Sequence, residues 1–320
     1  MSINRIQFQP GLSFAEFCQR FGTEAQCEAA LTAARWPNGW CCARCAGTRH
    51  FNTHSATGRK LWECFLCGYQ SSSLVGTIFE HTKLGLTSWF VAMFAMTQSK
   101  NAVSALQLKR ELGVNYKTAW LVKHKLLRVM ELRDEPHKLG GRVEIDDAYL
   151  GGEREGSVNG GRGAMNKSAF VAAVQTGEDG KPLYARFKLI SGFTIDAFKD
   201  WASANLQSSS HVVSDGTACF AHVGHIGASH ERHVTGHGRK AAQHASFKWV
   251  NTMLGNVKTS ISGTYHSIDH KKYGNRYLAE FAYRFNRRFD LAQMLPRLLR
   301  AAATTNPHTL AVLQYSEAAG

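Results

Sequence analysis

Two short apolar segments of the sequence carry aspartates. The segment 142–150 contains Asp146 and Asp147, and the segment 211–214 is followed directly by Asp215. We expect both segments to be strands, and because a strand alternates its faces, only one of Asp146 and Asp147 should enter a cleft. Aspartates at the ends of adjacent strands offer the hard oxygen ligands that Mg²⁺ prefers. The pattern predicts a metal-dependent catalytic site with Asp146 and Asp215, although strand-end aspartates also serve as turn residues.

A third ligand is predicted on a helix that follows. The later acids are poorly placed, since Glu231 falls in a glycine-rich stretch and Asp269 follows the helix. The helix carries Asn251 and, seven residues or two turns later, Lys258 on the same face. An asparagine carbonyl can bind Mg²⁺, and the lysine could hold a phosphate beside it. Gly255 between them is expected to give clearance for DNA or for the strand, because a glycine inside a helix costs roughly 1 kcal/mol. A solvated polar helix face has the same pattern.

Four of the eight cysteines form two C-x-x-C pairs. Cys42 with Cys45 and Cys64 with Cys67 are separated by 18 residues. Each pair places two thiolates on one side of a tight turn, and the two pairs complete a tetrahedral Zn²⁺ site. Four protein ligands leave no open position, so this zinc is predicted to be structural. Cys41 is an alternative to Cys42, which makes the pairs symmetrical. The cysteines without a partner at ligand spacing are predicted to be core residues: Cys18, Cys27 and Cys219.

The composition favours a polyanionic partner. Thirty-eight Lys and Arg against 24 acids leave a formal net charge of +14. Basic side chains on phosphates release condensed counterions, so the expected partner is double-stranded DNA. No run of about 18 apolar residues is long enough for a membrane span. The first residues lack the apolar core of a secretory signal peptide, so we expect a cytoplasmic, nucleoid-associated protein with no membrane partner.

The pattern along the chain predicts a multidomain α/β protein in four regions. Residues 1–80 should hold two short helices and the zinc ribbon, and residues 81–138 are helical with a break near Gly113. Residues 139–303 are predicted to form the catalytic domain and residues 304–320 a tail, mobile after Pro307. The predicted order of elements is three strands, a helix, a fourth strand and further helices. This order is typical of an RNase-H-like fold, which is a mixed sheet with flanking helices. Its expected segments are 142–150, 169–175, 183–190, 194–206 and 211–214, before a histidine-rich loop at 222–240.

Basic residues of the first two regions are predicted to contact DNA. The helices on either side of Gly113 have the apolar spacing of a helix-turn-helix, in which the second helix meets the DNA. Antiparallel helix pairs without a DNA role share this pattern, and surface solvation explains the charges of the ribbon almost as well. The predicted contacts are Arg44 and Lys60 beside the cysteines, and Tyr116, Lys117, Lys123 and Lys125 on the second helix.

The chain resembles the insertion-sequence transposases of family fifteen ninety-five, bacterial relatives of Merlin-type elements, over nearly its whole length. The resemblance rests on the motifs Arg35-Trp36-Pro37-Asn38-Gly39, Gly76-Thr77-Ile78-Phe79-Glu80, Val143 to Gly152, Ser214-Asp215-Gly216, Gly263-Thr264-Tyr265-His266 and Phe281 to Arg288. Asn251 stands where many members carry glutamate, and some branches have asparagine there with lysine seven residues later. The resemblance implies Asp146, Asp215 and Asn251 as metal ligands and Lys258 as an associated catalytic residue.

The resemblance also implies a reaction. Two Mg²⁺ or Mn²⁺ ions would activate water to hydrolyse one phosphodiester at each transposon end, and the freed 3′-hydroxyl would attack target DNA. Two ends must be joined, so a homodimer or larger homo-oligomer on terminal inverted repeats is expected. Two alternatives stay open: a disabled relative that acts as a zinc-ribbon DNA-binding regulator, and an RNase-H-like nuclease or resolvase without transposition.

Overall fold

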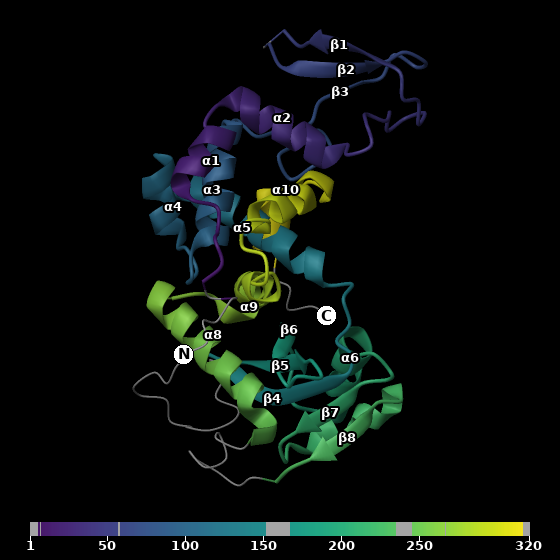
Figure 1. Cartoon of the computed structure of the whole chain (residues 1–320), viewed down its shortest axis with the longest axis vertical. Coiled ribbons are helices and arrows are strands. Elements are labelled where there is room, and N and C mark those ends of the chain that lie inside the picture. Colours follow the sequence, from purple (N-terminus) through teal and green to yellow (C-terminus); the bar gives the residue numbers. More distant parts are fainter. Residues whose placement is uncertain are drawn as a thin grey trace. The chain divides into compact units, whose positions relative to one another are not determined.

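The computed structural model describes residues 6, 8–56, 58–151, 167–234, 245–265 and 267–315. They form two compact units, residues 1–129 with 289–313 and residues 130–288 with 314–320 (Figure 1). None of the helices in these ranges is both long and apolar enough to cross a membrane. Gly152, His237, His244 and His266, which belong to segments singled out in the sequence, lie outside the described residues.

Helices near the two ends of the chain pack together in the first unit. The side chain of Ser13 caps the first helix, and Thr23 and Gln26 form a complete capping box at the second, as their spacing predicts. The last of these helices contacts the second and third. The four helices are α1 (Phe14–Phe21), α2 (Glu24–Arg35), α3 (Leu86–Gln98) and α10 (Met294–Thr304).

The compact units differ from the predicted domain limits. Residues 1–80 and 81–138 fall largely in one unit, and α10, predicted within the catalytic region, belongs to the first unit. The reason is packing, because α10 buries its apolar face against helices that lie far away in sequence. The tail also contains a short helix, α11 (Leu310–Gln314), in which Leu313 is buried. Cys18 is exposed, which corrects its predicted core position.

The zinc ribbon is a small antiparallel sheet. Its three strands are ordered β1-β2-β3. Trp40 and Trp62 are buried with Cys42 and Cys64 and form most of its small core. The strands are β1 (His50–His54), β2 (Lys60–Cys64) and β3 (Gln70–Ser71).

The predicted helix pair is present. Helix α4 (Ala105–Leu112) ends at Gly113, which adopts the left-handed backbone conformation with φ of 63° that favours glycine. Helix α5 (Tyr116–Asp134) follows two residues later, with Tyr116 and Lys117 exposed at its start. The segment predicted as one helix before Gly113 is interrupted a second time, between α3 and α4.

Two of the residues predicted to contact DNA are buried. Lys123 is only 1% exposed and Lys125 only 7%. The Lys123 ammonium donates to the carbonyl of Val103, and that of Lys125 donates to the carbonyl of Ile78 at 2.6 Å. A buried ammonium needs such partners, because it has lost its hydration. The prediction that Lys123 and Lys125 contact DNA is therefore wrong, and both serve to join segments of the first unit.

A five-stranded mixed sheet forms the centre of the second unit. Its order is β6-β5-β4-β7-β8, in which β4, β5 and β6 are antiparallel and β7 and β8 run parallel to β4. This is the mixed sheet with flanking helices expected of an RNase-H-like fold. The strands are β4 (Arg142–Leu150), β5 (Ser168–Thr176), β6 (Pro182–Leu189), β7 (His211–Ser214) and β8 (Ser229–Arg232).

The strand β8 corrects the prediction of a loop at 222–240. The first part of that stretch belongs to a 3₁₀ helix, η1 (Ala218–Ile226), and β8 then adds to the edge of the sheet beside β7. The alternation of β8 is hard to recognise because it is short and polar, and pairing with a neighbouring strand is what defines it. Residues 235–244 lie outside the described residues.

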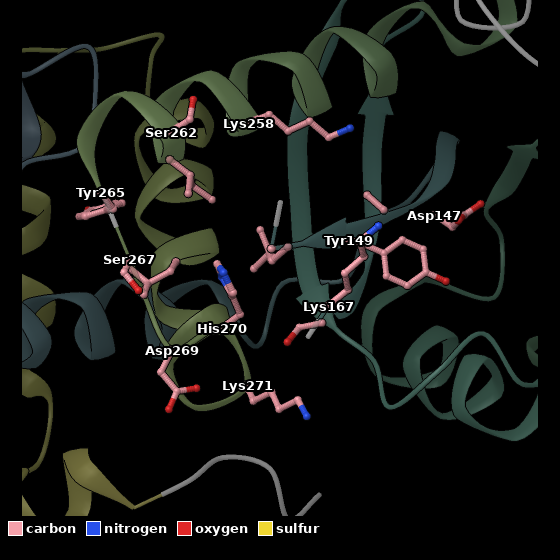
Figure 2. A pocket seen from close by; sticks show the side chains of 16 residues that line it. Asp147, Tyr149, Lys167, Lys258, Ser262, Tyr265, Ser267, Asp269, His270 and Lys271 are labelled. Atoms are coloured by element: carbon pink, nitrogen blue, oxygen red, sulfur yellow. The ribbon is translucent and has the colours of Figure 1, made fainter. Parts of the chain in front are cut away.

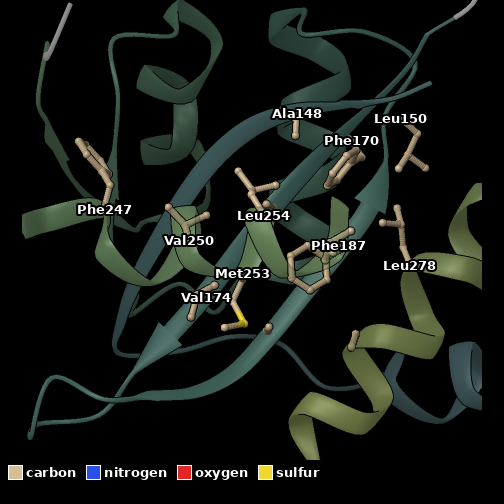
Figure 3. Packing of buried hydrophobic residues seen from close by; sticks show 14 of the residues in the cluster. Ala148, Leu150, Phe170, Val174, Phe187, Phe247, Val250, Met253, Leu254 and Leu278 are labelled. Atoms are coloured by element: carbon tan, nitrogen blue, oxygen red, sulfur yellow. The ribbon is translucent and has the colours of Figure 1, made fainter. Parts of the chain in front are cut away.

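Helices cover both faces of this sheet. Ala148 and Leu150 point to the face covered by α8 (Lys248–Thr264) and α9 (His270–Asn286). Residues of odd number in β4, such as Val143, point to the face covered by η1 and α6 (Ile195–Asn205). Figure 3 shows Val250, Met253 and Leu254 of α8 packed over the strands, which fixes the helix against the sheet.

Candidate metal-dependent active site

Three carboxylates come together where β4 and β7 lie side by side. Each of Asp146, Asp147 and Asp215 offers an oxygen, and these oxygens all lie within 4.8 Å of one another. Ile145 is paired with Ser214 in the parallel ladder, so the next residues along the two strands are Asp146 and Asp215. The predicted meeting of Asp146 and Asp215 is thus present.

The third carboxylate corrects the expectation that only one aspartate of the doublet reaches the cleft. The Asp147 N–H donates to Asp146 Oδ1 at 2.9 Å. The Thr217 hydroxyl donates to Asp147 Oδ1 and the Thr217 N–H to Asp215 Oδ1, both at 3.0 Å. Strand alternation places Asp146 and Asp147 on opposite faces of β4. Asp215, however, lies beyond the end of β7, so the alternation of that strand does not fix the direction of its side chain. Sequence reasoning excluded Asp147 from the site. The presence of two adjacent aspartates in this segment was the feature that could have indicated it.

The cluster is electrostatically unfavourable without a cation. Burial, and then the carboxylates of Asp215 and Asp147, raise the pKa of Asp146 to about 7, while Lys258 lowers it. Three carboxylates this close repel one another, and hard divalent cations prefer oxygen ligands of this type. The donor set therefore fits a divalent metal ion.

A buried glutamate joins α8 to the strand that carries Asp146. Glu144, two residues earlier on β4, is only 1% exposed. Its Oε2 accepts the N–H groups of Trp249 at 2.8 Å and Val250 at 3.0 Å, and its Oε1 lies 2.8 Å from Arg142 Nη1. These N–H groups belong to the first turn of α8 and lack acceptors within the helix. Glu144 therefore sets where α8 begins relative to the acidic cluster.

Asn251 and Lys258 lie on one flank of α8, two turns apart. Lys258 is exposed, and its charge is near enough to Asp146 to lower the pKa of that carboxyl. Asn251 is half-buried, and within the described residues its side chain makes no hydrogen bond. Its role as a metal ligand therefore stays a prediction. A Cβ at Gly255 would meet no atom within 4 Å, so clearance for the strand does not explain this glycine.

A cavity of about 870 Å³ opens beside the acidic cluster. Asp147, Tyr149 and Lys258 line it together with residues at the start of α9 (Figure 2). The hydroxyl of Tyr265, which also lines the cavity, donates to Glu280 at 2.8 Å and so belongs to the wall. The cavity continues the acidic cluster along the surface of α8.

The two acids that the sequence argument set aside have other partners. Glu231 on β8 lies 3.0 Å from His211 Nε2 and 2.5 Å from His233 Nε2. Asp269 caps α9 by accepting the N–H of Lys272 at 3.1 Å. Neither carboxylate joins the acidic cluster.

The four predicted zinc ligands also come together. Their sulfur atoms lie within 4.8 Å of one another, with 3.6 Å between Cys42 and Cys67 and 3.4 Å between Cys45 and Cys64. A tetrahedral zinc with bonds of about 2.3 Å spaces its sulfurs by about 3.8 Å, so the donor set fits Zn²⁺. Cys41 is exposed beside the carbonyl of Ala46, which confirms the choice of Cys42.

The two predicted DNA contacts of the ribbon are compatible with the structure. Arg44 is exposed, and its N–H donates to Cys42 Sγ. Lys60 is half-buried, with its ammonium 5.0 Å from the centre of the Trp62 ring. Both therefore stay predicted contacts.

The fold and the site define the class of protein: an RNase-H-like domain with clustered carboxylates, preceded by a zinc ribbon. Comparison with protein families gives a closer assignment. Residues 138–286 match the ISXO2-like transposase domain and residues 22–70 match the transposase zinc-ribbon domain, both of IS1595 type. The chain belongs to the IS1595 family of insertion-sequence transposases.

A curated relative supports this assignment. The chain is 30% identical over 130 residues to an uncharacterised protein in transposable element ISH50 of Halobacterium salinarum. The matched segment covers 41% of this chain and 43% of the relative, so the chain matches less than half of the relative's length.

Proposed function

We propose that this protein binds the terminal inverted repeats of an insertion sequence and carries out metal-dependent DNA cleavage and strand transfer. The observation that supports this most directly is the cluster of Asp146, Asp147 and Asp215 on an RNase-H-like sheet. Membership of a transposase family and the net charge of +14 are in keeping with it.

Asp146, Asp215 and Asn251 are the proposed ligands that would hold two Mg²⁺ or Mn²⁺ ions. Such ions, when bound, activate the attacking oxygen and stabilise the leaving oxygen of a phosphodiester. Thr217 keeps the carboxylates of Asp147 and Asp215 oriented through its hydroxyl and N–H. Lys258 lies close to Asp146 and is proposed to hold a non-bridging phosphate oxygen, which orients the DNA strand for in-line attack.

DNA recognition is proposed to lie in the first unit. Arg44 and Lys60 of the ribbon, and Tyr116 and Lys117 at the start of α5, are the proposed contacts to the inverted repeats. Tyr116 and Lys117 are both exposed, in contrast to the buried lysines further along α5. Strand transfer requires two transposon ends and target DNA in one complex, so we propose a homodimer or larger homo-oligomer on DNA.

The experiment is a cleavage assay with a labelled duplex from one end of the insertion sequence, in Mg²⁺ or Mn²⁺. We expect nicking at the end of the repeat that disappears with chelator and in Asp146→Ala. Binding without cleavage in either metal would instead support the second candidate, a DNA-binding regulator. The observation that favours this candidate is Asn251, which offers no negative charge where many relatives carry glutamate.

A further inference from the structure

Three lysines from separate segments of the second unit line the cavity beside the acidic cluster. Lys167 precedes β5, Lys258 lies on α8, and Lys271 lies in the first turn of α9 (Figure 2). We propose that this cavity binds the DNA strand next to the scissile phosphodiester, with Lys167 and Lys271 holding its phosphates. This inference rests on the proposed function and extends it, because it assigns two DNA-binding residues outside the acidic cluster.

The charges of these lysines are available to a ligand. Within the described part of the chain, no carboxylate forms an ion pair with Lys167, Lys258 or Lys271. The carboxylates that line the cavity are otherwise engaged: Asp147 belongs to the acidic cluster, and Asp269 caps α9. Three ammonium groups around one cavity form a site for an anion with several charges, as a DNA strand offers at successive phosphates.

The remaining lining suits the other parts of a nucleotide. Leu150, Ile261 and Ile268 provide apolar surface, and Tyr149 provides an aromatic ring. Sugars and bases pack against such surfaces while their phosphates meet lysines. Cavities of about 300–1,000 Å³ hold a drug-sized ligand, so about 870 Å³ accommodates a short piece of a strand but not a duplex.

The position of the cavity determines which part of the DNA it holds. Asp147 belongs both to the acidic cluster and to the lining, so the two sites share a wall. Lys258 lines the same cavity from α8. A strand whose phosphodiester is at the carboxylates therefore continues into the cavity.

Lysine footprinting on the whole protein tests the inference. The Asp146→Ala variant, which we expect to bind DNA without cutting it, is acetylated with and without a short single strand of arbitrary sequence, and modified lysines are quantified by mass spectrometry. We expect the strand to protect Lys167, Lys258 and Lys271 several-fold. Lys272 is the internal control, since it follows Lys271 in sequence but extends over the ring of Tyr273 and does not line the cavity.

Affinity provides the second measurement. Lys271→Ala should weaken binding of the same strand and lower the slope of log Kd against log salt by about 0.7, the value of one phosphate contact to a single strand. Lys272→Ala should leave affinity and slope unchanged, and Lys271→Arg should restore both. Lys271 is exposed, so its loss does not threaten folding.

Other outcomes distinguish the inference from the function on which it rests. If transposon ends are cleaved while DNA protects none of the three lysines, the inference is wrong and the proposed function stands. If a mononucleotide at equal phosphate concentration protects them as well as the strand does, the cavity is a nucleotide site and the inference is also wrong. Absence of both DNA binding and metal-dependent cleavage would overturn both.

Discussion

The two candidate metal sites of this protein are assembled in opposite ways. The zinc site gathers four thiols from two tight turns, and its most distant contact, between Cys42 and Cys67, spans 25 positions. The acidic site gathers carboxylates from two strands, and the hydrogen bond from Thr217 to Asp147 spans 70 positions. A site made from local turns is encoded by spacing, whereas a site made across a sheet depends on strand order and register.

The sites also differ in what supports them. The ribbon core is four buried residues, two of them zinc ligands, so metal and fold depend on each other. The acidic site lies on a sheet with an apolar cluster on each face, which keeps the carboxylates together despite their repulsion. We therefore expect loss of zinc to unfold the ribbon, and loss of the proposed metal at the acidic site to leave the sheet intact.

The largest effect is expected from breaking the zinc site. Cys64→Ser should abolish zinc binding and unfold the ribbon, because structural zinc contributes about 10–16 kcal/mol to such small modules. Metal analysis and limited proteolysis would measure this, with Cys41→Ser as the matched control that keeps its zinc. Equal zinc content in both variants would contradict the assignment of ligands.

The next effect concerns the ligand that completes the acidic site. Asn251→Ala should abolish detectable cleavage, a loss of more than about 100-fold, since residues outside the ligand set already cost about 10–100-fold. Asn251→Glu should retain some activity, because it supplies a carboxylate oxygen at the same position. Asp147→Ala is the comparison variant. A larger loss of cleavage and of Mn²⁺ affinity in Asp147→Ala than in Asn251→Ala would indicate that Asp147 is the third ligand. Cleavage rates and Mn²⁺ affinity are the measurements.

A smaller effect is expected at the contact between β4 and α8. Glu144→Ala should lower the free energy of unfolding by about 2–3 kcal/mol, because it removes the acceptor of two helix N–H groups and the ion-pair partner of Arg142. Glu144→Gln keeps an acceptor oxygen, so its free energy of unfolding should fall by less than that of Glu144→Ala. Urea unfolding gives the stability, and faster amide exchange at Trp249 and Val250 would locate the change. Unchanged exchange there would contradict the role of Glu144.

The smallest effect is a dependence of metal affinity and stability on pH at the acidic site. Metal binding requires the ionised form of Asp146, whose pKa is raised to about 7, so Mn²⁺ affinity should rise about tenfold per unit below that pH and level off above it. The raised pKa means that the folded state binds more protons than the unfolded state between about pH 4 and pH 7. The metal-free protein should therefore lose stability as pH rises through that range. Calorimetry at pH 6, 7 and 8 would measure the affinity, and thermal melts of Asp146→Asn should lack the pH-dependent loss.

Local patterns in the sequence predicted many elements closely. The bounds of β4 and β7 agree with the apolar segments, and Gly113 ends a helix where a break was expected. Thr23, whose spacing to Gln26 is that of a capping box, begins the second helix. Each of these depends on neighbours within a few residues, where spacing and backbone preference decide the structure.

Burial was harder to predict than secondary structure. Lys123 and Lys125 have the charge and the helical position of DNA contacts, yet both donate to carbonyls of distant segments. A helix exposes one face and buries another, and which face a lysine occupies depends on what packs against it. The same reasoning explains the wrong domain predicted for α10. Its apolar face shows that the helix packs against something, but not which unit it packs against.

By itself, the sequence determined the four clustered cysteines, the meeting of Asp146 and Asp215, and the transposase family, although Asp146 lies in the middle of β4 and not at its end as predicted. Only the tertiary structure decided that Asp147 joins them, that Glu144 holds the start of α8, and that three lysines surround the adjoining cavity. The reason is the range of the interactions. Turns and strands follow from contacts between near neighbours, while carboxylates, helix ends and lysines from distant segments meet only when the sheet has set the order of its strands.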